Sequence, residues 1–205
     1  MSFKSLRDDG AAVLLDKDVT PDAIGFNDLT TDAAGRIYVG SLAFHVVAGA
    51  PPKPGHLHVI DVDGTVRTVS DGVVVTNGLA FSPDENKLYI VESGTVPRAI
   101  YAFDVVGDGS KLANGKKLIV TEKEGTPDGF RVDVDGNLWC GWGMGTAELD
   151  GVRIFNPQGV PIGHISLPER AANVCFGGPK RNRLFMAASH SIYALYVNTQ
   201  GLKGG

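Results

Sequence analysis

The sequence predicts an all-β protein of the β-propeller type, and three observations support this. Four segments share one pattern, in which a polar Asn or Asp precedes an apolar strand, a turn and a second strand that carries an aromatic residue. The aromatic residue follows the polar one by 11 or 12 positions, and the segments start 50, 51 and 45 residues apart. A repeat of this length, in a chain without a long helical period, is typical of small antiparallel sheets that pack against one another. The starting residues are Asn27, Asn77, Asp128 and Asn173, and the aromatic residues are Tyr38, Tyr89, Trp139 and Phe185.

The first two repeats each supply four expected strands. In the first repeat these lie at 27–31, 36–41, 56–61 and 65–69. In the second they lie at 78–81, 87–91, 98–105 and 117–121. Alternating or clustered apolar residues identify the strands, and segments such as Ser82-Pro83-Asp84 supply the turns. The long loop 42–55 is expected beside the propeller axis, because loops of this length in compact repeats are often functional.

The third and fourth repeats complete the chain. The third begins at Asp128 and continues with strands at 151–155 and 161–167, which are joined by a turn containing Gly159. The fourth supplies strands at 173–176, 183–188 and 191–197, so it lacks an outer strand. We expect the apolar segment 11–15 to fill that position, because propellers commonly close by pairing the two ends of the chain. The chain, 1–205, is therefore expected to form a single propeller domain with about four blades.

The composition narrows the class of partner. A formal charge of −4 and dispersed basic residues argue against nucleic acid or an anionic membrane as a partner. The sequence has no N-terminal apolar region and no long apolar run, so we expect neither a signal peptide nor a membrane span. Cys140 and Cys175 lack metal-type spacing and are expected to be buried thiols in a reducing, cytoplasmic environment.

Three polar residues at equivalent positions of successive blades are candidates for one site. Asn27, Asn77 and Asp128 each stand in a dipeptide that is an ordinary turn signal, but their recurrence at one phase of the repeat favours convergence on the axis. Their side-chain oxygens suit hard cations such as calcium, magnesium or manganese. Asp128 is the one carboxylate among them and is the natural general acid or base. Asn173 occupies the fourth position, where a structural role is equally expected.

The four repeats also resemble a known family. They read FNDLTTDAAGRIYVGS, NGLAFSPDENKLYIVES, GTPDGFRVDVDGNLWC and NVCFGGPKRNRLFMAAS. These motifs, in this order from about Phe26 to Tyr196, resemble the SMP-30/gluconolactonase/regucalcin family of six-bladed propellers that hydrolyse lactones with a divalent metal on the axis. The resemblance implies that Asn77 and Asp128 ligate the metal, that Asp128 doubles as the acid/base group, and that Asn27 binds substrate, a metal-bound water or the metal. Calcium is the expected cation, with magnesium, manganese or zinc as alternatives.

The chain departs from the family pattern in two places. The family has a metal-binding Glu in a Glu-Gly-Pro type of motif in its first blade, and this motif is absent here, as if an N-terminal blade region were missing. The family also often has an Arg two residues before the Asn of its Asn-Asp motif, where this chain has Gly25. We therefore expect weaker cation binding. An incomplete propeller would expose an apolar flank, so we expect a fragment of a longer protein or a homo-oligomer rather than a closed four-bladed ring.

Several other residues invite a functional interpretation. We expect Trp142 to line the pocket mouth and to stack on a sugar ring, and Trp139 to lie in the core. A metal site formed by His45, His56 and His58 is disfavoured, because His56 and His58 alternate along one strand and suit an ordinary strand role. No nucleophile elbow is present, so covalent catalysis lacks support.

These observations favour an enzyme that opens sugar-type lactones. The cation would polarise the lactone carbonyl, and Asp128 would assist the attack of water. Two alternatives stay open: phosphotriester hydrolysis at the same site, and a catalytically silent propeller that binds a metal or a small ligand. The absent Glu favours a silent propeller, whereas the oxygen donors Asn27, Asn77 and Asp128 favour the enzyme.

Overall fold

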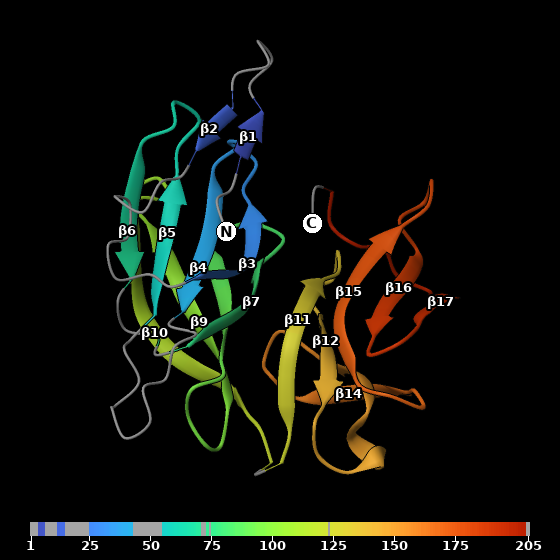
Figure 1. Cartoon of the computed structure of the whole chain (residues 1–205). Helices are drawn as coiled ribbons and strands as arrows, with labels where there is room; N and C mark the ends of the chain where they lie inside the picture. Colours follow the sequence, from blue (N-terminus) through green and yellow to red (C-terminus); the bar gives the residue numbers. More distant parts are fainter. Residues whose placement is uncertain are drawn as a thin grey trace.

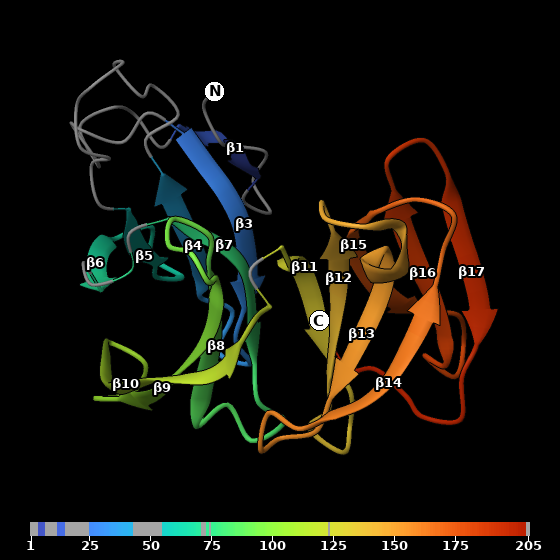
Figure 2. The ribbon, with the colours of Figure 1, turned by 90° about the horizontal axis from the view of Figure 1, so that it is seen from below.

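The fold was obtained as a computed structural model, which describes residues 4–6, 12–14, 25–42, 55–70, 73, 75–122 and 124–203. In this part of the chain the secondary structure is almost entirely strand, with one short 3₁₀ helix, η1 (Ala147–Leu149). Four antiparallel sheets follow one another along the sequence, and we call them blades 1 to 4. Figures 1 and 2 show them in order from blue to red, with the first strand of each blade toward the middle of the molecule and β6 and β17 at its periphery. The all-β propeller prediction is confirmed.

Each blade is a simple meander, because its strands pair in chain order. The loop expected at 42–55 lies largely outside the described residues. Blade 1 contains β3 (Gly25–Thr31), β4 (Ile37–Leu42), β5 (His56–Ile60) and β6 (Val66–Ser70). Blade 2 contains β7 (Thr76–Phe81), β8 (Lys87–Glu92), β9 (Ala99–Val106) and β10 (Lys111–Val120). Blade 3 contains β11 (Thr126–Val132), β12 (Leu138–Gly143), β13 (Gly151–Phe155) and β14 (Pro161–Ser166). Blade 4 contains β15 (Ala171–Gly177), β16 (Arg183–Ala188) and β17 (Ile192–Tyr196).

The N-terminal strands differ from the sequence prediction. The segment expected to complete blade 4 forms β2 (Ala12–Leu14), which pairs with β1 (Lys4–Leu6) in a hairpin rather than with β17. Among the described residues blade 4 therefore has three strands. A hairpin closes a loop of a few residues, whereas pairing with β17 closes one of most of the chain, and loop-closure entropy favours the local pairing.

The apolar core lies between the blades. One cluster joins residues of blades 1 and 2, a second joins blades 2 and 3, and a third joins blades 3 and 4. Fully buried representatives are Leu57, Leu79, Ile100, Phe130 and Leu184. Each such side chain contributes roughly 1.5–3 kcal/mol by leaving water. Each blade is thus stabilised by its neighbours, as expected for a repeat architecture.

Hydrogen bonds to an Asp explain the recurrent aromatic residue in two of the blades. The hydroxyl of Tyr38 donates to Asp32 Oδ2 at 3.3 Å, and the indole Nε1 of Trp139 donates to Asp133 Oδ2 at 2.9 Å. The Asp side chains also accept backbone N–H groups of the turn that follows. The aromatic ring therefore fills the core while its polar atom fastens the turn.

The turn after the first strand of each blade has the same geometry. Its fourth residue donates a backbone hydrogen bond of 2.9–3.0 Å to its first residue and has a positive φ. That fourth residue is Gly35 (φ 84°), Glu85 (φ 55°), Gly136 (φ 84°) and Arg181 (φ 50°) in blades 1 to 4. Two blades thus place a non-glycine residue where the left-handed conformation favours glycine.

Candidate active site

The first strands of successive blades lie side by side, with β7 between β3 and β11, and β11 between β7 and β15. Glycine permits this close approach. A Cβ atom on Gly78 would overlap the carbonyl oxygen of Asp128, and one on Gly129 would overlap the side chain of Asn173. In Asn77-Gly78 and Asp128-Gly129, the polar residue is therefore followed by the residue that lets the next strand approach.

Two of the predicted site residues are in direct contact. The side-chain Nδ2 of Asn27 donates to Asn77 Oδ1 at 2.9 Å and to the carbonyl oxygen of Thr76 at 3.3 Å. The Nδ2 of Asn77 in turn donates to Ser93 Oγ at 3.3 Å. Residues 50 positions apart in the sequence thus share one hydrogen-bond network near the starts of β3 and β7.

Asp128 lies at the corresponding place on β11 and is held by an arginine from blade 4. Its Oδ2 forms an ion pair with the guanidinium of Arg170, the residue before β15. The side chain of Asp128 is 16% exposed and that of Arg170 is 33% exposed. The Nε of Arg170 is buried and lacks a partner among the described residues. The sequence analysis missed Arg170, because Leu-Pro-Glu-Arg before a strand carries no recognisable signal of a site.

Asp28 is a second carboxyl group in this region that the sequence analysis missed. It occupies the position that Gly78 and Gly129 occupy in the next two blades. Its Oδ1 accepts a hydrogen bond from the Leu29 N–H at 2.8 Å, whereas its Oδ2 is buried without a partner among the described residues. Burial is the main reason that the pKa of Asp28 is raised, and the charge of Asp128 adds to it, against the Leu29 N–H and the charge of Arg131.

This donor set fits a hard cation. Asn27, Asn77 and Asp128 supply amide and carboxylate oxygens, which are the ligands that calcium and magnesium prefer, and the unpartnered oxygen of Asp28 adds negative charge nearby. Within the described ranges no group of three or more His, Cys, Asp or Glu side chains is arranged to hold a metal ion. Arg170 competes with a cation for Asp128, so binding at this site is expected to be weak.

Trp142 lies in the core rather than at the pocket mouth, so the expectation for this residue was wrong. Its side chain is 1% exposed, its ring packs against Phe155, and the Arg153 guanidinium lies 5.1 Å from the ring centroid. The physical reason is its place on β12, an inner strand of a blade that is covered by neighbouring blades. Trp139 is buried, as predicted.

The histidines have structural partners. His58 is 2% exposed and contacts the hydroxyls of Ser41 and Thr68 at 3.1 and 3.2 Å. Burial, with a smaller effect of the charge of His56, lowers the pKa of His58 to about 4. The ring of His56 lies 6.0 Å from that of His58. His45 lies outside the described residues.

One of the two cysteines departs from expectation. Cys140 is buried, which raises the pKa of its thiol, but Cys175 is exposed. Cys175 lies on β15 between the buried residues Val174 and Phe176, so its side chain is on the opposite face of the strand, away from the core between blades 3 and 4.

The comparisons with known proteins agree with this fold. The family model described as SMP-30/Gluconolactonase/LRE-like region matches residues 5–190. This chain belongs to that family. It is 30% identical over 165 residues to the pentonolactonase XacC of Haloferax volcanii, covering 80% of this chain and 53% of that protein. It is 29% identical to regucalcin of Gallus gallus, covering 88% of this chain and 60% of that protein.

A solved structure of a gluconolactonase from Xanthomonas campestris has a TM-score of 0.74 and 28% identity to this family member, covering 93% of this chain and 63% of that one. The chain thus spans roughly half to two thirds of the length of these relatives. Among the described residues, no helix has the length and apolar character needed to cross a membrane.

Proposed function

We propose that this protein is a divalent-cation-dependent hydrolase that opens sugar-type lactones in the cytoplasm. The observation that supports the proposal is the hydrogen bond between Asn27 and Asn77 on adjacent first strands, with Asp128 on the next first strand, β11, which packs beside β7. Relatives named pentonolactonase and gluconolactonase support lactones as the substrate class.

The roles follow from the chemistry of each side chain. Asn27 and Asn77 would offer their amide oxygens to the cation and the substrate, and Asn77 Oδ1 would first release the Nδ2 of Asn27. When bound, the cation supplies Lewis acidity that polarises the lactone carbonyl. Asp128 accepts the proton of the attacking water and later returns it to the ring oxygen that leaves. Asp128 is suited to this because it is partly buried and stays accessible at the start of β11.

Arg170 supports an anionic product. Gly25 stands where the resemblance leads us to expect a substrate-binding Arg, and Arg170 brings a guanidinium to Asp128 from blade 4 instead. Opening a lactone creates a carboxylate, and a guanidinium binds carboxylates in a bidentate manner. Arg170 is therefore placed to exchange Asp128 for the carboxylate of the product.

Calcium and manganese titrations by calorimetry, with hydrolysis of glucono-1,5-lactone followed in the same samples, test this proposal. We expect saturable binding and cation-dependent turnover, and we expect both to be lost in Asp128→Asn. Asp135→Asn, an exposed carboxylate in the turn of the same blade, is the matched control and should behave as the unaltered protein. Binding without turnover would favour a silent calcium-binding protein, and turnover that survives in Asp128→Asn would remove Asp128 from the mechanism.

A further inference from the structure

A cavity lies at the end of the first strands that is opposite to Asn27, Asn77 and Asp128. It has a volume of about 300 Å³ and is lined by the ends of β3, β7 and β11, by the turn after β15 and by residues 202–203. Asn27, Asn77 and Asp128 lie near the starts of their strands. Thr30 and Thr31 at the cavity lie three and four positions after Asn27, or about 10 to 13 Å along the strand at the rise of an extended chain. The cavity is therefore distinct from the proposed active site.

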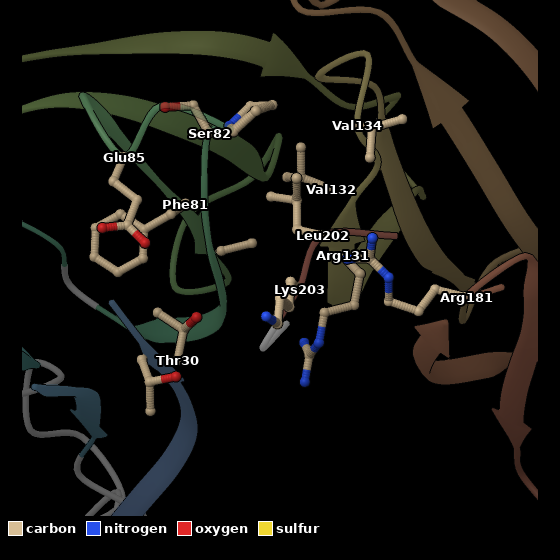
Figure 3. A pocket seen from close by; sticks show the side chains of 13 residues that line it. Thr30, Phe81, Ser82, Glu85, Arg131, Val132, Val134, Arg181, Leu202 and Lys203 are labelled. Carbon is tan, nitrogen blue, oxygen red and sulfur yellow. The ribbon is translucent and has the colours of Figure 1, made fainter. Parts of the chain in front are cut away.

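Three cationic side chains line this cavity: Arg131, Arg181 and Lys203. Figure 3 shows Arg131 and Lys203 extending into the space between Thr30 and Arg181. Within the described part of the chain none of the three forms an ion pair, whereas Arg36, Arg153 and Arg170 all do.

The acidic groups near the cavity do not neutralise this charge. Arg131 donates one hydrogen bond, at 2.8 Å, to the carbonyl oxygen of Phe130, and its charge also reaches Asp28. Glu85 is the acidic residue of the lining, and its Oε1 accepts the backbone N–H of Ala33 at 2.8 Å. Three cations and one carboxylate leave a charge of 3 − 1 = +2 in a chain whose formal charge is −4. Such a concave, positively charged site attracts anions.

The backbone at Arg181 is a second and independent observation. Arg181 has a φ of 50° at the turn position where blades 1 and 3 have Gly35 and Gly136. A side chain in this conformation is unfavourable, and residues held in this way concentrate at functional sites. Glu85, which also lines the cavity, has a φ of 55° at the same position of blade 2. Both residues that replace glycine at this turn position line the cavity.

The C-terminal segment brings the third cationic residue, Lys203, to the cavity. The N–H of Gly201 donates to the carbonyl oxygen of Arg181 at 2.9 Å, and Val134 N–H donates to the carbonyl oxygen of Gln200 at 2.9 Å. These bonds hold residues 200–203 against the end of β11, beside Arg131. These bonds bring together the backbone segments that carry Arg131, Arg181 and Lys203.

We propose that this cavity binds a small phosphate-bearing anion through Arg131, Arg181 and Lys203. Guanidinium groups bind phosphate oxygens in a bidentate manner, and a lysine ammonium adds a point charge. The hydroxyls of Thr30 and Thr31 line the same space and can bind the remaining part of a sugar-sized molecule. A volume of about 300 Å³ is at the small end of metabolite sites, which suits a phosphate monoester of a sugar or a polyol.

The test is calorimetric titration of the whole chain with glucose 6-phosphate and with glucose, in buffer that contains EDTA so that no divalent cation takes part. We expect saturable binding of glucose 6-phosphate that weakens with added sodium chloride, and no binding of glucose. Arg131→Gln and Arg181→Gly should each weaken binding at least about tenfold, because each removes one charge-assisted contact. Arg181→Gly introduces the residue of the equivalent turns, so its melting temperature should equal or exceed that of the unaltered protein.

Two controls locate the effect. Lys180→Gln removes an exposed cation next to Arg181 that does not line the cavity, and should bind glucose 6-phosphate normally. Asp128→Asn should also bind it normally, even if lactone hydrolysis is absent, which separates this proposal from that of the previous subsection. No saturable binding, unchanged binding in both arginine variants, or loss of binding in Asp128→Asn would each overturn the proposal.

Discussion

Acidification should destabilise the fold through His58. The ring is 2% exposed and its two nitrogens lie 3.1 and 3.2 Å from the hydroxyls of Ser41 and Thr68. Burial lowers its pKa from 6.5 to about 4. The unfolded chain therefore binds a proton near pH 6.5, while the folded protein binds it only near pH 4. The stabilisation is complete above pH 6.5 and is lost progressively as the pH falls from 6.5 toward 4.

The size of the effect follows from the shift of 6.5 − 4 = 2.5 pKa units. At about 1.4 kcal/mol per unit, this amounts to about 3.5 kcal/mol below pH 4, and to about 2 kcal/mol between pH 7.5 and pH 5. A loss of this size is a large fraction of the stability of an ordinary domain.

Urea unfolding of the unaltered protein and of His58→Gln at pH 7.5 and pH 5 measures this contribution. Other groups titrate in both proteins, so the informative quantity is the difference between their pH dependences. We expect the unaltered protein to lose about 2 kcal/mol more than His58→Gln. His190→Gln, which replaces a histidine whose side chain is 89% exposed, is the matched control and should follow the unaltered protein. Equal pH dependence in all three proteins would refute the assignment of the effect to His58.

Three further predictions concern the axis and the outer edge. Arg170→Gln should bind calcium about tenfold more tightly by calorimetry, because the guanidinium beside Asp128 opposes a second positive charge. The same variant should hydrolyse gluconolactone more slowly. Weaker calcium binding would contradict this role of Arg170. Gly78→Ala should lower the free energy of unfolding by about 2 kcal/mol in urea, because the new methyl group overlaps backbone of β11; an unchanged value would contradict the close approach. Ile192 is 78% exposed on β17, at a sheet edge. If the protein associates through this edge, Ile192→Lys should lower the mass measured by sedimentation equilibrium. An unchanged oligomer would place the interface elsewhere.

The strands were predictable because each is fixed by local information. Apolar alternation and turn residues identified four sheets, and the structure differs mainly in length, as at β10, which begins at Lys111 rather than at 117. The repeat also located the first strands of the blades, and with them the meeting of Asn27 and Asn77. The pairing of 11–15 was not predictable, because the sequence of an edge strand does not specify its partner. Pairing with β1, the nearest strand in the sequence, has the lower entropic cost of loop closure.

The burial of Trp142 was missed for a different reason. Trp139 and Trp142 stand three residues apart on one strand, and the sequence offers no sign that both faces of that strand are covered. A bulge on β11 between Pro127 and Phe130, opposite this part of β12, further obscures which residues share a face. Such facts depend on how blades pack together, and a single sequence does not encode them in any local pattern.

The positions at which one blade has a different type of residue from the equivalent position of the other blades are the most informative about function. Glycine follows the polar residue in blades 2 and 3, but Asp28 stands there in blade 1, with a buried oxygen that has no partner among the described residues. Glycine occupies the turn in blades 1 and 3, but Glu85 and Arg181 stand there in blades 2 and 4 and line one cavity. Folding alone favours glycine at these positions, so charged residues there need another reason, and sites that violate local preference are where binding and catalysis are expected. On this argument we assign Asp28 to the proposed cation site at one end of the strands, and Arg181 to the proposed anion site at the other.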